Sequence, residues 1–124
     1  MATRFVFDAL SAEYPASNPA AFTLAGRHPV LAFDAATAET VYFSGIVPQG
    51  WTGTITAYIY YMMASATSGK VDFTVAVEAV TPGDALDMDA GDSFDTANTI
   101  TAPTVPGTAG YMNVVSCTLT NNDS

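Results

Sequence analysis

Apolar and polar side chains alternate along two neighbouring stretches in the middle of the chain, residues 53–63 and 70–79. Every odd position from 71 to 79 is apolar, whereas most even positions are polar. In residues 53–63 the odd positions are also largely apolar, but the even positions carry Thr, Tyr and Met. A period of two is typical of strands that bury one face. Because six small and polar residues, 64–69, join the two stretches, we predict a β-hairpin here.

Shorter runs of strand character lie on both sides of this hairpin, separated by turns rich in Gly, Pro and Asn. Asp34 is a candidate N-cap for a single helical turn over residues 34–39, and no longer segment favours a helix. The sequence therefore predicts an all-β protein, an antiparallel β-sandwich resembling a jelly roll, with about seven or eight short strands and at most one helical turn. The further strand candidates are residues 3–8, 30–33, 40–47, 98–102 and 111–120.

A length of 124 residues fits one domain, so we expect residues 1–124 to form a single β-sandwich. Prolines at positions 15 and 19 disfavour a helix near the N-terminus, and residues 1–27 are expected to form an extended segment that packs on this domain. Hydrophobic residues make up 49% of the chain and charged residues only 12%, a composition typical of compact β proteins rather than of disordered chains.

Twelve acidic residues against three basic ones give a net charge of −9. Binding to nucleic acid or to anionic lipid requires clustered Lys and Arg, so the charge argues against both partners. The N-terminus lacks the apolar core of a signal peptide, and no apolar run is long enough to span a bilayer. We therefore expect synthesis in the cytoplasm of a host cell without a signal peptide.

Nothing in the sequence resembles a set of catalytic residues. Cys117 is the only cysteine, so no disulfide forms within the chain, and its neighbours 114–119 suggest an apolar strand position. His28 is the only histidine and precedes Pro29, where a turn residue is expected. No spacing selects a pair of carboxylates for acid–base chemistry. We predict that the chain is not an enzyme.

An acidic loop over residues 84–95 is the one candidate metal site. Alternate carboxylates supply the hard oxygen ligands that Ca²⁺ requires, and Asp87, Asp89 and Asp92 are the selected ligands, with Gly91 permitting a sharp turn. The loop lacks the spacing and closing Glu of an EF-hand, and a solvated acidic loop is the simpler interpretation. The expectation is therefore no cofactor, with calcium as an open alternative.

Aromatic residues on the first central strand form the candidate binding surface. Tyr58, Tyr60 and Met62 share one face, and Trp51 precedes them in a turn. Tyr and Met are enriched at protein interfaces, so these four residues are predicted to contact another molecule. Two alternatives remain open: the rings pack against protein, or Trp51 and the tyrosines, with Tyr42, stack on sugar rings as in a carbohydrate-binding module.

Four segments resemble small jelly-roll proteins encoded among the structural genes of tailed phages and in environmental viral sequences. The resemblance runs from about residue 28 to the end of the chain and consists of turns and strands, with no chemical signature. The four segments are His28-Pro-Val-Leu-Ala-Phe-Asp, Glu39-Thr-Val-Tyr-Phe-Ser-Gly-Ile-Val-Pro, Ala64-Ser-Ala-Thr-Ser-Gly-Lys-Val-Asp-Phe-Thr-Val and Thr104-Val-Pro-Gly-Thr-Ala-Gly.

The resemblance implies a non-enzymatic subunit of a virus particle or similar extracellular assembly, such as a capsid decoration or appendage protein, with no catalytic residues to carry over. The family pattern continues with a further strand pair after the segment matching residues 114–122, and these C-terminal strands are expected to be missing here. Open sheet edges pair readily with other chains. The expected partners are copies of this chain, with a trimer as one form, a second polypeptide that completes the sheet, and other capsid or particle proteins.

Overall fold

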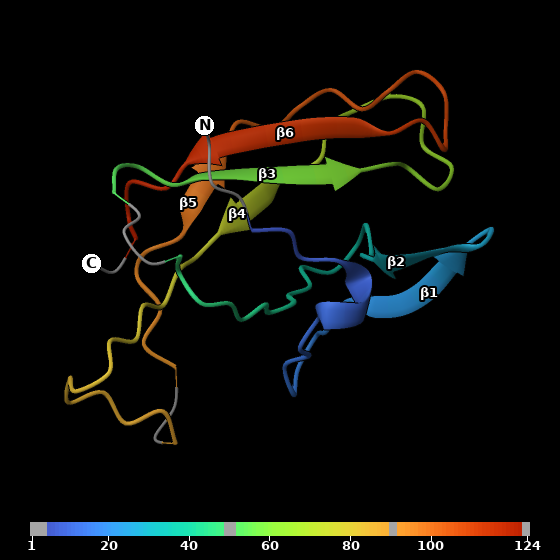
Figure 1. Cartoon of the computed structure of the whole chain (residues 1–124). Helices are drawn as coiled ribbons and strands as arrows, with labels where there is room; N and C mark the ends of the chain where they lie inside the picture. The colour runs from blue at the N-terminus through green and yellow to red at the C-terminus, as the bar shows by residue number, and fades with distance from the viewer. Residues whose placement is uncertain (1–4, 49–51, 90–91, 123–124) are drawn as a thin grey trace. The chain divides into compact units, whose positions relative to one another are not determined.

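The structure is a computed structural model that describes residues 5–48, 52–89 and 92–122 (Figure 1). Those residues are almost entirely β, with six strands in three antiparallel two-stranded sheets and one 3-10 turn. The predicted all-β class is therefore confirmed, with six strands in place of the seven or eight expected. The chain divides into two compact units, Met1–Thr52 and Gly53–Ser124, each of which is described by itself. The single domain stays a prediction.

The first unit contains a 3-10 turn, η1 (Ala9–Ser11), and a hairpin of β1 (Ala21–Ala25) with β2 (His28–Ala32). The Asp8 carboxylate caps η1 by accepting hydrogen bonds from the backbone N–H groups of Leu10 and Ser11. Ala25 pairs with His28, which leaves a two-residue turn that begins with Gly26 at a φ of 63°. A type II′ hairpin turn requires positive φ at that position, and glycine adopts it without strain.

Three of the predicted elements of the first unit are wrong. Residues 5–8 form no strand, and the helical turn expected over residues 34–39 is replaced by bends. Within residues 40–47, only isolated bridges form, in which Thr40 pairs with Pro19 and Tyr42 with Glu13. The partner segment contains two prolines, which have no backbone N–H to donate, so the pairing does not extend into a ladder.

The second unit contains β3 (Thr56–Tyr61), β4 (Phe73–Val75), β5 (Asn98–Ile100) and β6 (Asn113–Thr118). The predicted central hairpin is wrong, because β3 pairs with β6 and β4 pairs with β5. The two alternating stretches meet through side chains instead: the rings of Tyr61 and Phe73 lie 5.3 Å apart at 60°. Alternation determines which side chains point inward, but the six-residue link is long enough to carry the chain from one sheet to the other.

The buried centre of the second unit is small and contains one polar group. Ile100, Val105 and Leu119 are 3–5% exposed, and Asn98 is buried beside them. The Asn98 amide donates to the carbonyls of Val75 and Asn121, at 3.1 and 2.8 Å. Its oxygen accepts from the backbone N–H groups of Thr120 and Asn121, both at 3.0 Å. This side chain therefore joins β4, β5 and the segment after β6.

Candidate interaction face of the β3–β6 sheet

The β3–β6 sheet presents one face inward and one face to solvent, because burial alternates strictly along both strands. Ala57, Ile59 and Tyr61 of β3 are half-buried, as are Val115 and Cys117 of β6. The exposed side chains between them form what we call the tyrosine face. It consists of Thr56, Tyr58, Tyr60, Met62, Met112, Val114, Ser116 and Thr118.

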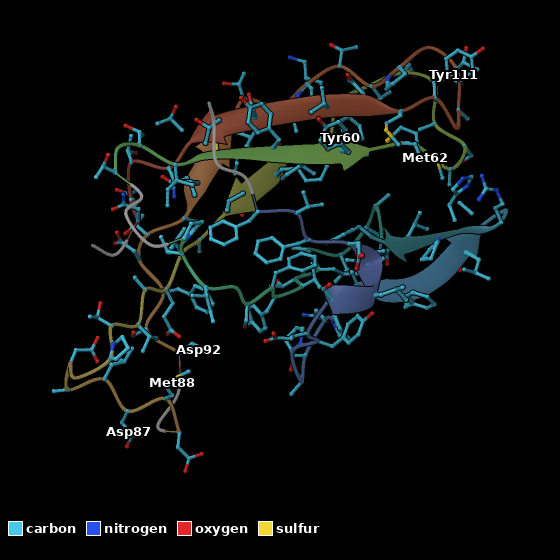
Figure 2. The ribbon with its side chains drawn as sticks, viewed as in Figure 1. Tyr60, Met62, Asp87, Met88, Asp92 and Tyr111 are labelled. Carbon is cyan, nitrogen blue, oxygen red and sulfur yellow. The ribbon has the colours of Figure 1, made fainter. Side chains whose placement is uncertain are left out.

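Large apolar and aromatic groups are exposed on the tyrosine face. Tyr58 and Tyr60 are 64% and 66% exposed, Met112 is 74% exposed, and Met62 and Val114 are 38% and 44% exposed. Figure 2 shows Tyr60 and Met62 along β3, with Tyr111 in the loop beyond the strand ends. None of the eight residues of the face carries a charge at neutral pH. A neutral, apolar surface of this kind is typical of a protein interface.

The two strands contribute side chains of different size to this face. The register pairs Thr56 with Thr118, Tyr58 with Ser116 and Tyr60 with Val114. Two tyrosines and a methionine therefore follow β3, whereas β6 carries mostly small side chains opposite them. We call the row of large side chains along β3 the raised lane of the face, and the row of mostly small side chains along β6 the lower lane.

A shallow, open hollow of about 280 Å³ lies on the sheet and is lined by Tyr60, Met112, Asn113 and Val114. Its volume falls just below the roughly 300–1,000 Å³ of small-molecule sites. The lining contains no carboxylate, thiol, amine or imidazole. The hollow is therefore suited to an apolar side chain of another molecule rather than to acid–base or nucleophilic chemistry.

The structure brings together three of the four residues predicted to form an interface, Tyr58, Tyr60 and Met62. Trp51 lies outside the described residues, and Tyr42 belongs to the first unit. Sequence reasoning missed Met112 and Val114, which enter the face only because β6 is the partner of β3. Their alternation within residues 111–120 was the available signal, but it does not identify the paired strand.

The three proposed calcium ligands, Asp87, Asp89 and Asp92, are all exposed. Figure 2 shows Asp87 and Asp92 on the acidic loop. The Asp87 carboxylate accepts a hydrogen bond from the backbone N–H of Asp89 at 3.0 Å, which closes a local turn. Within the described ranges no three His, Cys, Asp or Glu side chains are grouped closely enough to hold a metal ion. Gly91 lies outside these ranges. The calcium site stays a prediction.

Hydrogen bonds from the backbone lower the pKa of Asp84 at the start of this loop. Its carboxylate accepts from the N–H groups of Thr81, at 2.9 Å, and Leu86, at 3.0 Å, and both bonds favour the charged form. Gly83 has a φ of 96° within the same turn. These two hydrogen bonds, which hold the turn, are therefore strongest when Asp84 is ionised.

The other reactive side chains occupy structural positions. His28 begins β2, and its Nδ1 lies 3.3 Å from the carbonyl of Ala25, across the hairpin turn. Cys117 is half-buried on the inward face of β6, and burial raises the pKa of its thiol. A raised thiol pKa leaves less thiolate at neutral pH, which lowers reactivity.

A second cluster of exposed apolar side chains lies in the first unit. The ring of Phe7 stacks on Phe5 at 6.2 Å and on Phe43 at 5.3 Å, and each of the three rings is more than one-third exposed. Gly45 lies beneath the stack, where a Cβ atom would stand 3.1 Å from the Phe7 ring. The stack therefore presents aromatic surface to solvent in its own unit.

Large hydrophobic side chains are widely exposed in both units. Among the described residues, twenty large hydrophobic side chains are exposed. Exposed aromatic and apolar side chains of this kind are enriched at protein interfaces.

No helix within the described ranges is long and apolar enough to cross a membrane. Comparisons of the chain with family models, with curated proteins and with solved structures found no match.

Proposed function

We propose that this chain is a non-enzymatic structural protein, a subunit of a virus particle or a similar extracellular assembly. It acts through the tyrosine face and through the edges of its sheets. The observation that carries the proposal is the large apolar surface left exposed by a chain whose length suffices for a normal core. Monomeric soluble proteins rarely expose more than a few hundred Å² of contiguous apolar surface.

Open strand edges favour the same role. Each of the six strands within the described ranges has one ladder neighbour, so its other edge carries backbone groups that another strand can pair with. Addition of a strand from a neighbouring copy, or from a second polypeptide, would extend these two-stranded sheets. In this proposal, contacts of this kind complete a jelly-roll-like sandwich in the assembly.

The charge and the resemblance to phage structural proteins favour a capsid decoration or appendage protein in particular. A net charge of −9 disfavours nucleic acid as a direct partner, which supports a position on a protein surface of the particle. Self-association, with a trimer as one form, and contact with other capsid proteins follow from the proposal. No catalytic step is assigned.

Native mass spectrometry and sedimentation velocity over a range of concentrations test the proposal. We expect oligomers that form without any small-molecule ligand, with amide protons at the strand edges exchanging more slowly in the oligomer than after dilution. A chain that stays monomeric at the highest soluble concentration, with its edge amides already protected, would contradict it.

A carbohydrate-binding module is the second candidate, because Tyr58 and Tyr60 expose their rings two residues apart on one face. Stacking on sugar rings requires such exposed aromatic groups. A glycan array separates the candidates: binding that is lost in both Trp51→Ala and Tyr60→Ala would favour the module. The structural role predicts no glycan binding above background.

A further inference from the structure

The tyrosine face is self-complementary in size. Its raised lane on β3 carries Tyr58 and Tyr60, and its lower lane on β6 carries Ser116 and Thr118. If a second copy is rotated by 180° about an axis parallel to the strands, its β3 lies over β6 of the first copy. A two-fold axis perpendicular to the strands would instead place raised lane on raised lane.

We infer that the tyrosine face binds the same face of a second copy of this chain, with the two-fold axis parallel to the strands. The inference rests on the proposed function and names the partner of its main surface. A rotation axis along the strands permits no shift along that axis. Tyr58 of one copy therefore faces Ser116 of the other, and Tyr60 faces Val114 in the same way.

The area of the face favours a second copy as the occupant, and the absence of charge on the face removes one obstacle to it. The face is uncharged within a chain of net charge −9, so contact between two copies brings no like charges together at its centre. An aromatic side chain offers about 150–250 Å². With two tyrosines and six smaller contributions, the face covers on the order of 600 Å² per copy, or roughly 1,200 Å² in total. That total reaches the lower end of the about 1,200–2,000 Å² of stable interfaces.

The packing mode also fits an established geometry. Two sheets that stack face to face keep their strands within about 30° of each other, which an axis along the mean strand direction allows. The inward face of this sheet already contacts its own unit through Tyr61 and Phe73. A second copy on the outward face would therefore bury both faces of the β3–β6 sheet.

Two methionines of nearly equal exposure provide a matched pair of variants. Met112 on the tyrosine face is 74% exposed, and Met88 on the acidic loop is 73% exposed. Sedimentation velocity of Met112→Glu should show a dissociation constant raised at least about tenfold, because a carboxylate is buried without a partner. The dissociation constant of Met88→Glu should stay within about a factor of two of that of the natural chain.

Ser116→Arg is a second disrupting variant, since a large charged side chain in the lower lane blocks Tyr58 of the other copy. Circular dichroism checks that each variant is folded. Oligomers that persist unchanged in both Met112→Glu and Ser116→Arg would overturn this interface while leaving the proposed function standing. A natural chain that remains monomeric at every concentration would overturn both.

Cross-linking tests the direction of the axis. Tyr58→Cys and Ser116→Cys chains, each also carrying Cys117→Ser, are mixed and treated with a short bismaleimide. We expect covalent dimers that join position 58 of one chain to position 116 of the other. Dimers that join 58 to 58 in preference would overturn the axis parallel to the strands.

Discussion

At the scale of single residues, Asn98 has the most consequence for the second unit. It is buried, and its amide hydrogen-bonds four backbone groups on two segments of the chain, β4 and residues 120–121. A buried donor or acceptor without a partner costs about 1–3 kcal/mol. Three of the hydrogen bonds of this side chain join β5 to the segment after β6.

We expect Asn98→Ala to lower the free energy of unfolding by about 2–4 kcal/mol, because backbone carbonyls and N–H groups lose their partners. Urea denaturation followed by circular dichroism measures the change. Asn113→Ala is the control: its amide donates to the Tyr61 hydroxyl, at 3.0 Å, and its oxygen accepts from the exposed Val114 N–H, at 2.9 Å, so its loss should cost about 1 kcal/mol. Equal losses in the two variants would contradict the role of Asn98.

Asp84 links the turn before the acidic loop to pH. Backbone hydrogen bonds lower its pKa in the folded chain, so ionised Asp84 contributes stability that is present above the unfolded pKa and is lost as pH falls through the folded pKa. Carboxyl carbon NMR should give a lower Asp84 pKa in the native chain than in urea. Asp84→Asn should lack this part of the loss of stability at low pH. A native Asp84 pKa equal to that in urea would show that the turn does not depend on the charge.

At the scale of elements, the connection from β5 to β6 depends on the backbone conformation of one glycine. Gly110 has a φ of 81°, and its N–H donates to the carbonyl of Met63, at 2.8 Å, next to the end of β3. A Cβ atom added to Gly110 would have no atom within 4 Å except those of the two adjacent residues. The requirement for glycine is therefore conformational rather than steric.

Gly110→Ala should destabilise the chain by about 1–2 kcal/mol, the cost of a left-handed backbone with a Cβ atom. Gly107 is the matched control: it lies in the same connection, also has open space around it, and has no positive φ. Thermal unfolding of the two alanine variants compares them. A loss in Gly107→Ala as large as that in Gly110→Ala would show that the positive φ of Gly110 is not the reason for the loss.

The sequence predicted the positions of the strands better than it predicted which strands pair with each other. The strand candidates 53–63, 98–102 and 111–120 correspond to β3, β5 and β6; β5 begins at the predicted residue, and the other ends are shorter by two or three residues. Residues 30–33 were predicted as a strand, but β1 and its hairpin with β2 were not, because prolines at positions 15 and 19 favour an irregular segment before it. A glycine at the first position of a two-residue turn was the available signal.

At the scale of the whole molecule, exposed apolar surface is the dominant feature. Twenty large hydrophobic side chains are exposed among the described residues, and under the proposed function association would add stability by covering them. The half-exposed stack of Phe5, Phe7 and Phe43 in the first unit is a second surface of this kind. In the proposed assembly the tyrosine face would be one of several contacts.

The melting temperature should rise with protein concentration, because dilution separates the copies and removes their contribution to stability. Differential scanning calorimetry over a hundredfold range of concentration measures this effect. Met88→Glu should behave as the natural chain does, and Met112→Glu should show a weaker dependence. A melting temperature independent of concentration in the natural chain would argue against linked folding and assembly.

The sequence by itself determined the all-β class and which side chains of β3 point the same way, because side-chain alternation is a local property of an extended backbone. Only the tertiary structure decided that β3 pairs with β6 rather than with the stretch that follows it. Pairing depends on contacts between distant segments and on the loops that join them, which no local pattern encodes. The tyrosine face therefore contains residues from positions 56 and 118, at opposite ends of the second unit's sequence.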